Sequence, residues 1–231
     1  MADKKWAGPG QTFYGSQTSE NLVQTWGNGA TAYGGQQGDT LLGGTYYDMG
    51  NFINLYGMGG NDVLSSYANN SYFDGGEGDD IIYAYGTNNT FVGGEGNDFL
   101  QNTGNDNTVS GGVGDDTFIS TGDNNVINGG DGNDEASSTG NSNTLEGGAG
   151  DDTLSSNGAF NTISGGEGAD SITIAGSYNS VFAGAGNDTV TINSNHNLTV
   201  HTEDGDDTLI VNSSYNYAHT GTGNDTVIVQ G

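Results

Sequence analysis

Apolar residues recur along this chain in short segments at a fixed interval. From residue 57 onward, a glycine-rich stretch of about six residues precedes about three residues with a mostly apolar central position, and the pattern returns every nine residues. Such short segments predict β-strands, because successive side chains of a strand point to opposite faces. Helix is excluded for most of the chain, since apolar stripes of helical period are missing from the repeats. The pattern therefore predicts two short strands in every 18 residues.

The apolar positions fall into two series, one for each strand of the 18-residue unit. The first series is Leu64, Ile82, Leu100, Phe118, Leu154, Ile172, Val190, Leu209 and Val227. The second series is Phe73, Phe91, Val109, Ile127, Leu145, Ile163 and Val181. We expect the inward side chains of the two series to form two facing ladders, with the turns stacked along two edges.

A polar marker stands two residues before each of these positions. The aspartate markers, called register aspartates below, are Asp62, Asp80, Asp98, Asp116, Asp134, Asp152, Asp170, Asp188, Asp207 and Asp225, spaced by 18 residues except for one step of 19. Half a period later come Asn89, Asn107, Asn125, Asn143, Asn161, Asn179, Asn197 and Asn216, with Ser71 in the first slot. A fixed repeat period is the signature of a solenoid. We predict an all-β, right-handed parallel β-roll or β-solenoid with 18-residue coils.

Residues 1–56 differ from the rest and are predicted to form an N-terminal cap. They are rich in aromatic residues and repeat only loosely, although Asp39, five residues after Gly34, suggests one degenerate coil. The step from Asp39 to Asp62 is 23 residues, which indicates an insertion. Because the open end of a solenoid needs a cover, we expect one or two degenerate coils here, followed by the repeats of residues 57–231. An intermolecular contact is the alternative role of this segment.

The turn sequences resemble a known family. The segments GGEGDDIIY, GGEGNDFLQ, GGVGDDTFI and GGAGDDTLS resemble the GGxGxDxUx nonapeptide of the repeats-in-toxin (RTX) β-roll proteins. The resemblance implies that the turns bind calcium through the carboxylates of the ten register aspartates and through backbone carbonyls. The carbonyls expected to take part belong to Gly75, Gly93, Gly111, Gly129, Gly147 and Gly165. The resemblance also implies export through a type I channel and folding triggered by extracellular calcium.

The chemistry of the turns points to calcium independently of the resemblance. Carboxylates stacked about 4.8 Å apart in neighbouring coils repel one another unless a cation lies between them. Calcium takes roughly six to eight hard oxygen ligands, and glycine turns can point several carbonyls inward. Alternate nonapeptides, such as TGNDNTVSG, carry an uncharged asparagine in place of the ligand. We therefore expect about nine Ca²⁺ ions along one edge and an asparagine ladder, with amides hydrogen-bonded from coil to coil, along the other.

Folding is expected to depend on the metal. The positions four residues after the register aspartates are predicted to face the interior. Six of them hold small or polar residues, namely Ser66, Ala84, Asn102, Ser120, Ser138 and Ser156, and only Ile174, Ile192, Val211 and Val229 are larger. Small or polar residues bury little apolar area. We predict an unfolded chain without calcium and a folded chain with it.

Charge restricts the partners. The formal net charge is −27, with 29 acidic residues against only Lys4 and Lys5. Nucleic acids and anionic membranes are excluded as partners, because nothing here can neutralise phosphate. The chain has no cysteine, and its first residues lack the apolar run of a signal peptide. We expect an extracellular protein that is secreted without an N-terminal signal peptide.

The sequence gives no support for an enzyme. The only histidines, His196, His201 and His219, have no repeating partner, and no serine or threonine stands in a recognisable nucleophile setting. We predict a secreted calcium-binding structural protein. An ice-binding solenoid, suggested by outward rows that contain Thr153, Thr189 and other threonines, is an alternative, as is an adhesin or accessory calcium-binding module.

The predicted partner is another copy of the chain. The last coil, GTGNDTVIVQG, places Val227 and Val229 on a strand edge that invites a further strand. If the first coil of a second molecule supplies that strand, the contact is heterologous and propagates into a head-to-tail homopolymer. An extracellular surface or matrix is a further partner to consider.

Overall fold

The computed structural model describes residues 3–44, 51–193, 198–212 and 217–230. The chain divides into two compact units, residues 1–117 and 118–231, and each is described by itself. The regular elements of the described residues are β-strands, and no helix among them could cross a membrane. The predicted all-β class is confirmed.

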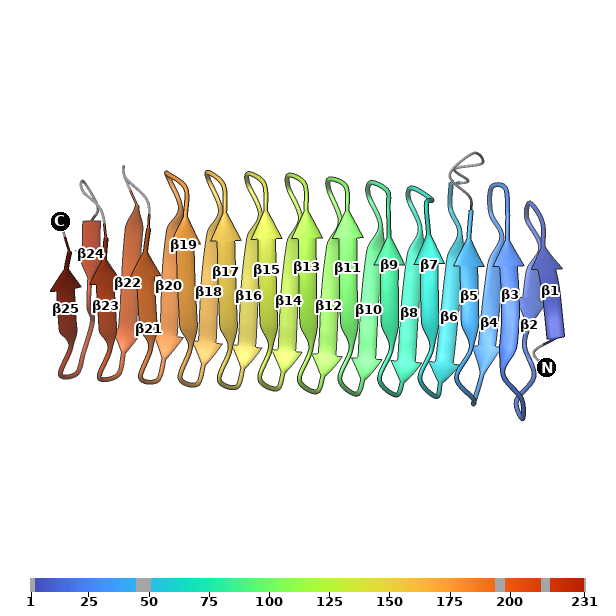
Figure 1. The fold of residues 1–231 in the computed structure, drawn as a ribbon, viewed down its shortest axis with the longest axis horizontal. Helices are drawn as coiled ribbons and strands as arrows, with labels where there is room; N and C mark the ends of the chain where they lie inside the picture. Colours follow the sequence, from blue (N-terminus) through green and yellow to red (C-terminus); the bar gives the residue numbers. More distant parts are fainter. Residues whose placement is uncertain (1–2, 45–50, 194–197, 213–216, 231) are drawn as a thin grey trace. The chain divides into compact units, whose positions relative to one another are not determined.

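The first unit consists of two parallel sheets between which the chain alternates, one strand in each (Figure 1). Its odd-numbered sheet contains β1 (Asp3–Ala7), β3 (Asn21–Thr25), β5 (Thr40–Gly43), β7 (Val63–Ser66), β9 (Ile81–Ala84) and β11 (Phe99–Thr103). Its even-numbered sheet contains β2 (Thr12–Tyr14), β4 (Thr31–Gly35), β6 (Asn54–Gly59), β8 (Tyr72–Glu77), β10 (Thr90–Glu95) and β12 (Thr108–Val113). One strand from each sheet makes one coil, as predicted for a β-solenoid.

The second unit repeats this arrangement. Its odd-numbered sheet contains β15 (Glu135–Thr139), β17 (Thr153–Asn157), β19 (Ser171–Ala175), β21 (Thr189–Ile192), β23 (Thr208–Val211) and β25 (Thr226–Val229), and β13 (Thr117–Thr121) spans the boundary between the units. Its even-numbered sheet contains β14 (Val126–Asp131), β16 (Thr144–Ala149), β18 (Thr162–Glu167), β20 (Ser180–Ala185), β22 (Thr199–Asp204) and β24 (Tyr217–His219).

Strand register follows the sequence period. Ile82 pairs with Leu64 in the odd-numbered sheet, and Phe91 pairs with Phe73 in the even-numbered sheet. Paired residues are therefore one coil apart, so that equivalent side chains stack along each unit. The rings of Phe73 and Phe91 illustrate this, with centroids 5.2 Å apart and planes within 8°.

The core consists of the two predicted apolar series. All their members from Leu64 to Leu209 are at most 2% exposed. The predicted polar interior is also present, since Ser66, Asn102, Ser120, Ser138 and Ser156 are buried. The interior is thus narrow and only partly apolar, which limits how much hydrophobic burial can stabilise the fold.

Residues 3–44 continue the same two sheets. In the odd-numbered sheet Leu41 of β5 pairs with Leu64 of β7, and Val23 of β3 pairs with Leu41. In the even-numbered sheet Ala32 of β4 pairs with Leu55 of β6. The division at residue 56 stays a prediction, but the described part of this segment is built as coils of the same kind.

Candidate metal centre

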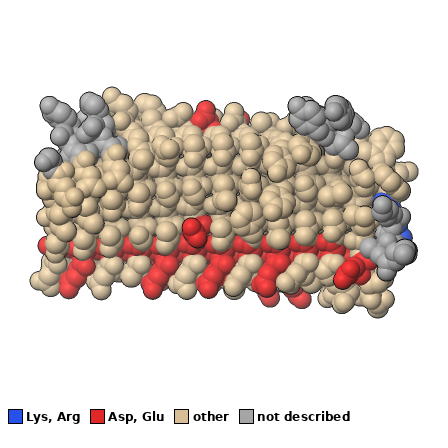
Figure 2. Space-filling model, viewed as in Figure 1, with Lys and Arg blue, Asp and Glu red and all other residues tan. Residues whose placement is uncertain are grey.

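Two kinds of turn connect the sheets. Turns that lead from an even-numbered to an odd-numbered strand end in the register aspartates and are called the Asp edge. Turns that lead from an odd-numbered to an even-numbered strand end in the asparagine series and are called the Asn edge. In Figure 2 the acidic side chains of each unit gather along the edge where its even-numbered strands end in Figure 1.

The register aspartates are buried and linked from coil to coil. Those from Asp62 to Asp207 are 1–2% exposed, and Asp225 is intermediate. The backbone N–H of one aspartate donates to Oδ1 of the aspartate in the next coil, as from Asp62 to Asp80 at 2.7 Å and from Asp152 to Asp170 at 2.9 Å. One carboxylate oxygen in each coil therefore has a fixed backbone partner.

The second carboxylate oxygen has no donor. Oδ2 is buried without a hydrogen-bond partner in Asp62, Asp80, Asp98, Asp152, Asp170, Asp188 and Asp207. A buried, unsatisfied carboxylate oxygen is costly, since both its hydration and a replacement hydrogen bond are missing. Each of these atoms needs a proton or a cation.

Glycine makes room for these oxygens beside a carbonyl of the next coil. A Cβ at Gly75 would collide with Oδ2 of Asp80 and would lie 2.6 Å from the carbonyl oxygen of Gly93. The same pairing recurs at Gly147, with Oδ2 of Asp152 and the carbonyl oxygen of Gly165. The carboxylate oxygen and a glycine carbonyl of the neighbouring coil therefore both border the small space where a Cβ atom of the glycine would lie.

The Asn edge has the same hydrogen bond from one coil to the next, but its described side chains have no counterpart of the unpaired Oδ2 atom. The N–H of Asn143 donates to Oδ1 of Asn161 at 2.8 Å, which matches the bond between register aspartates. Nδ2 of Asn161, however, donates to the carbonyl oxygen of Gly140 at 3.1 Å. The predicted ladder is present, although its partners are backbone groups rather than other side-chain amides. An amide satisfies this edge by itself, whereas the carboxylates of the Asp edge do not.

Burial raises the pKa values of several of the register aspartates, a set called the aspartate row below. Loss of hydration raises the pKa of Asp62 to about 8 and the pKa values of Asp80 and Asp152 to about 7. Neighbouring carboxylates of the row raise these pKa values further, and the backbone N–H donors lower them. Without a cation, part of the row would hold protons near neutral pH.

These features fit a hard cation. Carboxylate and carbonyl oxygens are the ligands that calcium prefers, and each buried Oδ2 has such a carbonyl nearby. Among the described residues, no group of three or more histidine, cysteine, aspartate or glutamate side chains is arranged to hold a metal ion by itself. Each ion would therefore take one or two carboxylates of the row and complete its shell with backbone carbonyls or water. A bound ion supplies the positive charge that lets the carboxylates stack unprotonated.

Comparison with known proteins agrees with this reading. The sequence model of the RTX calcium-binding nonapeptide repeat, built on four copies, matches residues 54–73, 67–100, 102–136, 137–172, 176–193 and 201–229. The chain belongs to this RTX calcium-binding repeat family. No curated protein matches it. Calcium binding is thus a property of this RTX chain, while the number of ions and the ligands of each stay predictions.

The row of the RTX chain includes one aspartate that sequence reasoning did not count as a ligand. Asp39 is 2% exposed, its Oδ2 has no hydrogen-bond partner, and its Oδ1 accepts from the N–H of Asn21. Its N–H donates to Oδ1 of Asp62. The signal was present, because Gly34 precedes Asp39 by five residues, as Gly75 precedes Asp80.

Sequence reasoning also missed a second row of side chains on the Asp edge, formed by the residues that directly precede the register aspartates. The N–H of Asn97 donates to Oδ1 of Asp79 at 2.9 Å, and the N–H of Asp115 donates to Oδ1 of Asn97 at 3.0 Å. This row is exposed and alternates between aspartate and asparagine in these coils. Alternation keeps its carboxylates from stacking directly on one another, so this row needs no cation.

Without calcium, acidification should stabilise the RTX fold. The pKa values of about 6 to 8 along the row lie above the value of about 3.9 for an unfolded aspartate. Between these values the folded state holds more protons, so its stability rises as the pH falls from about 8 to about 4. Circular dichroism in calcium-free buffer at both pH values tests this. A salt titration at neutral pH is the control for screened surface repulsion, and equal or lower order at pH 4 would contradict the prediction.

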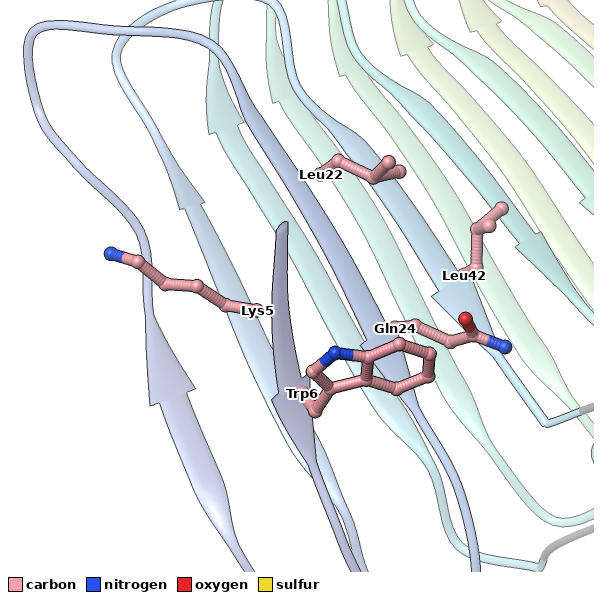
Figure 3. Close-up of a pocket in the computed structure, with 5 residues that line it drawn as sticks. All are labelled: Lys5, Trp6, Leu22, Gln24 and Leu42. Carbon is pink, nitrogen blue, oxygen red and sulfur yellow. The ribbon is translucent and has the colours of Figure 1, made fainter. Parts of the chain in front are cut away.

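Within the part of the chain that the structure describes, the other sequence features do not form a second chemical site. A small groove of about 90 Å³ lies on the outer face of the first strands, lined by Lys5, Trp6, Leu22, Gln24 and Leu42 (Figure 3). It is much smaller than ligand pockets of roughly 300–1,000 Å³, and its lining contains no hydroxyl, thiol or carboxylate.

The described histidines and the threonines of the predicted outward rows lie on outer faces. His201 stacks between Phe182 and His219, with centroid distances of 5.4 and 5.9 Å, and His196 lies outside the described residues. Thr189 pairs with Ser171 and Thr208 in an outward row, but Ile210 interrupts the adjacent row beside Thr191. The hydroxyl array is therefore incomplete, and we do not propose ice binding as a second function.

Proposed function

We propose that this chain is an extracellular structural protein that folds on calcium and assembles head to tail into a filament, matrix or surface layer. Membership of a calcium-binding repeat family supports the first step. Calcium-binding modules outside cells work at roughly 0.1–1 mM calcium, so the buried carboxylate row would remain unsatisfied until the chain reaches that environment. Export through a type I channel fits this order of events.

The exposed last coil is the observation that carries the assembly proposal. Val227 and Val229 pair with Leu209 and Val211, and so occupy inward register positions. They are nevertheless 52% and 69% exposed. An exposed apolar parallel strand with one unpaired edge is a template for a further strand. The first coil of a second copy has the matching parallel geometry.

Charge supports the same partner. Both basic residues of the chain, Lys4 and Lys5, belong to β1. The Nζ atom of Lys5 lies 5.1 Å from the centroid of the Phe13 ring. A strongly acidic chain whose basic residues all lie in its first strand favours a contact between that strand and the acidic surface of another copy.

The proposal predicts calcium-dependent polymers. Light scattering and negative-stain microscopy during a calcium titration should show monomers at low calcium and elongated particles of increasing mass at high calcium. Val227→Asp combined with Val229→Asp should leave a folded, calcium-loaded chain that no longer forms elongated particles, because a charged edge resists strand addition. Val113→Glu is the matched control, since other coils carry Glu77, Glu95 or Glu167 at this exposed turn position. A strictly monomeric calcium-loaded parent chain would refute head-to-tail assembly.

A further inference from the structure

The Asn-edge turns of the described coils contain a residue in the left-handed backbone region. Asn70, Asn88, Asp106, Asn124 and Ser142 occupy this position with φ between 53° and 59°. Asparagine, aspartate and serine suit such a position, because they are small and the first two tolerate the left-handed region well. In most coils the sequence therefore agrees with the backbone.

Two adjacent coils of the second unit break this rule. Phe160 has a φ of 61° and Tyr178 a φ of 62° at the equivalent position. A bulky residue with positive φ is a genuine outlier, and such strain persists only when something else favours the residue. Local backbone preference therefore does not explain these two aromatic side chains.

Burial does not explain them either. Phe160 is 62% exposed and Tyr178 is 48% exposed. Their rings stack on each other, with centroids 5.2 Å apart and planes within 8°. The stack covers one face of each ring and leaves an aromatic surface open at the tip of the edge. The two rings together form one contiguous exposed aromatic surface, which makes this turn a candidate for contact with a partner.

The charge distribution indicates what can approach this surface. In the second unit the four Asn-edge turns at 122–125, 140–143, 158–161 and 176–179 contain one carboxylate, Asp123. The four Asp-edge turns at 131–134, 149–152, 167–170 and 185–188 contain seven. In a chain with a net charge of −27, the Asn edge is the one of the two edges of this unit on which a second acidic copy meets less repulsion.

We propose that the Asn edge of the second unit, with Phe160 and Tyr178 at its centre, is a lateral contact between two copies of this chain. The stacked rings supply the apolar anchor, as aromatic residues do in many interfaces, and the surrounding asparagine, serine and alanine residues add no like charge. Such a contact is side by side and distinct from head-to-tail stacking. It would join single chains, or neighbouring filaments if these form.

The test isolates the lateral contact from end-to-end growth. A parent with Val227→Asp and Val229→Asp is studied in calcium by sedimentation velocity over a range of protein concentrations. It should show a concentration-dependent dimer. Adding Phe160→Asn and Tyr178→Asn should weaken dimerisation at least tenfold, while the thermal midpoint stays equal or rises because asparagine relieves the left-handed strain. A second variant with serine at both positions should weaken dimerisation to the same extent and should also remain stable, because Ser142 occupies the equivalent turn position in its own coil.

A matched control removes an aromatic residue from the same turn position elsewhere. Phe52 has a φ of 59° and is 61% exposed in the first unit. Phe52→Asn should leave dimerisation unchanged. A monomeric parent, or unchanged dimerisation in the asparagine and serine variants, would overturn the proposal. A thermal midpoint that falls while dimerisation persists would assign the aromatic pair to intramolecular stacking and would overturn it equally.

Discussion

Replacing Asp152, Asp170 and Asp188 together with asparagine should allow the second unit to keep much of its fold after calcium is removed. Asparagine has nearly the same shape and retains the Oδ1 acceptor for the backbone N–H of the preceding coil. It replaces the unsatisfied Oδ2 with an Nδ2 donor. The Asn edge already demonstrates that this amide satisfies a coil without a cation, as Asn161 and Asn179 do.

The expected result has two parts. In calcium-free buffer at neutral pH, the triple variant should retain more β-sheet circular dichroism and a higher thermal midpoint than the parent chain. By calorimetry it should bind fewer calcium ions. The charge-matched control changes the exposed Asp131, Asp151 and Glu167 to their amides, which removes the same number of negative charges. Equal gains in both variants would attribute calcium dependence to overall repulsion and would contradict the role of the buried row.

Gly168→Ala should destabilise the calcium-loaded chain strongly. Gly168 has a φ of +128°, and a Cβ there would collide with the carbonyl oxygen of Gly150 in the preceding coil. Alanine in this region costs more than about 1 kcal/mol, and relief of the collision with the carbonyl oxygen adds to that cost. Glycine occupies this turn position in every repeat from Gly60 to Gly223.

Denaturant unfolding in saturating calcium measures this effect. Ala169→Asn is the control, because Ala169 lies in the same turn, is exposed, and stands where Asn133 and Asn187 lie in other coils. It should change the free energy of unfolding little. A Gly168→Ala chain as stable as the control would show that the turn can adopt another backbone path.

The 18-residue coil could be predicted from the sequence because the same type of residue recurs at each position of the repeat and serves the same physical purpose there. The spacing of Asp80 and Asn89 fixed where the coils turn, and the apolar Ile82 and Phe91 fixed which side faces inward. The narrow interior followed from the same period. These inferences need only the residue types within one repeat and a constant repeat length, and the structure confirms them.

Other features could not be read from the sequence. The contrast between a satisfied Asn161 amide and an unsatisfied Asp152 oxygen depends on which backbone groups the turns present, and residue types do not reveal this. The left-handed position of Phe160 was hidden because phenylalanine does not signal positive φ, whereas Asn124 in the same slot does. Strands β1 to β5 lack most of the glycine motif, so their pairing with the later coils rests on apolar residues such as Leu41 that sequence alone did not place.

A calcium titration of the metal-free chain, followed by far-ultraviolet circular dichroism at neutral pH, tests the central claim most directly. Folding should be coupled to binding, because the ion supplies the charge that the buried aspartate row lacks. The account predicts weak β-sheet signal without calcium, a cooperative gain as calcium is added, and loss of that gain in excess chelator. A chain with the same β-sheet signal in excess chelator as in calcium would contradict it.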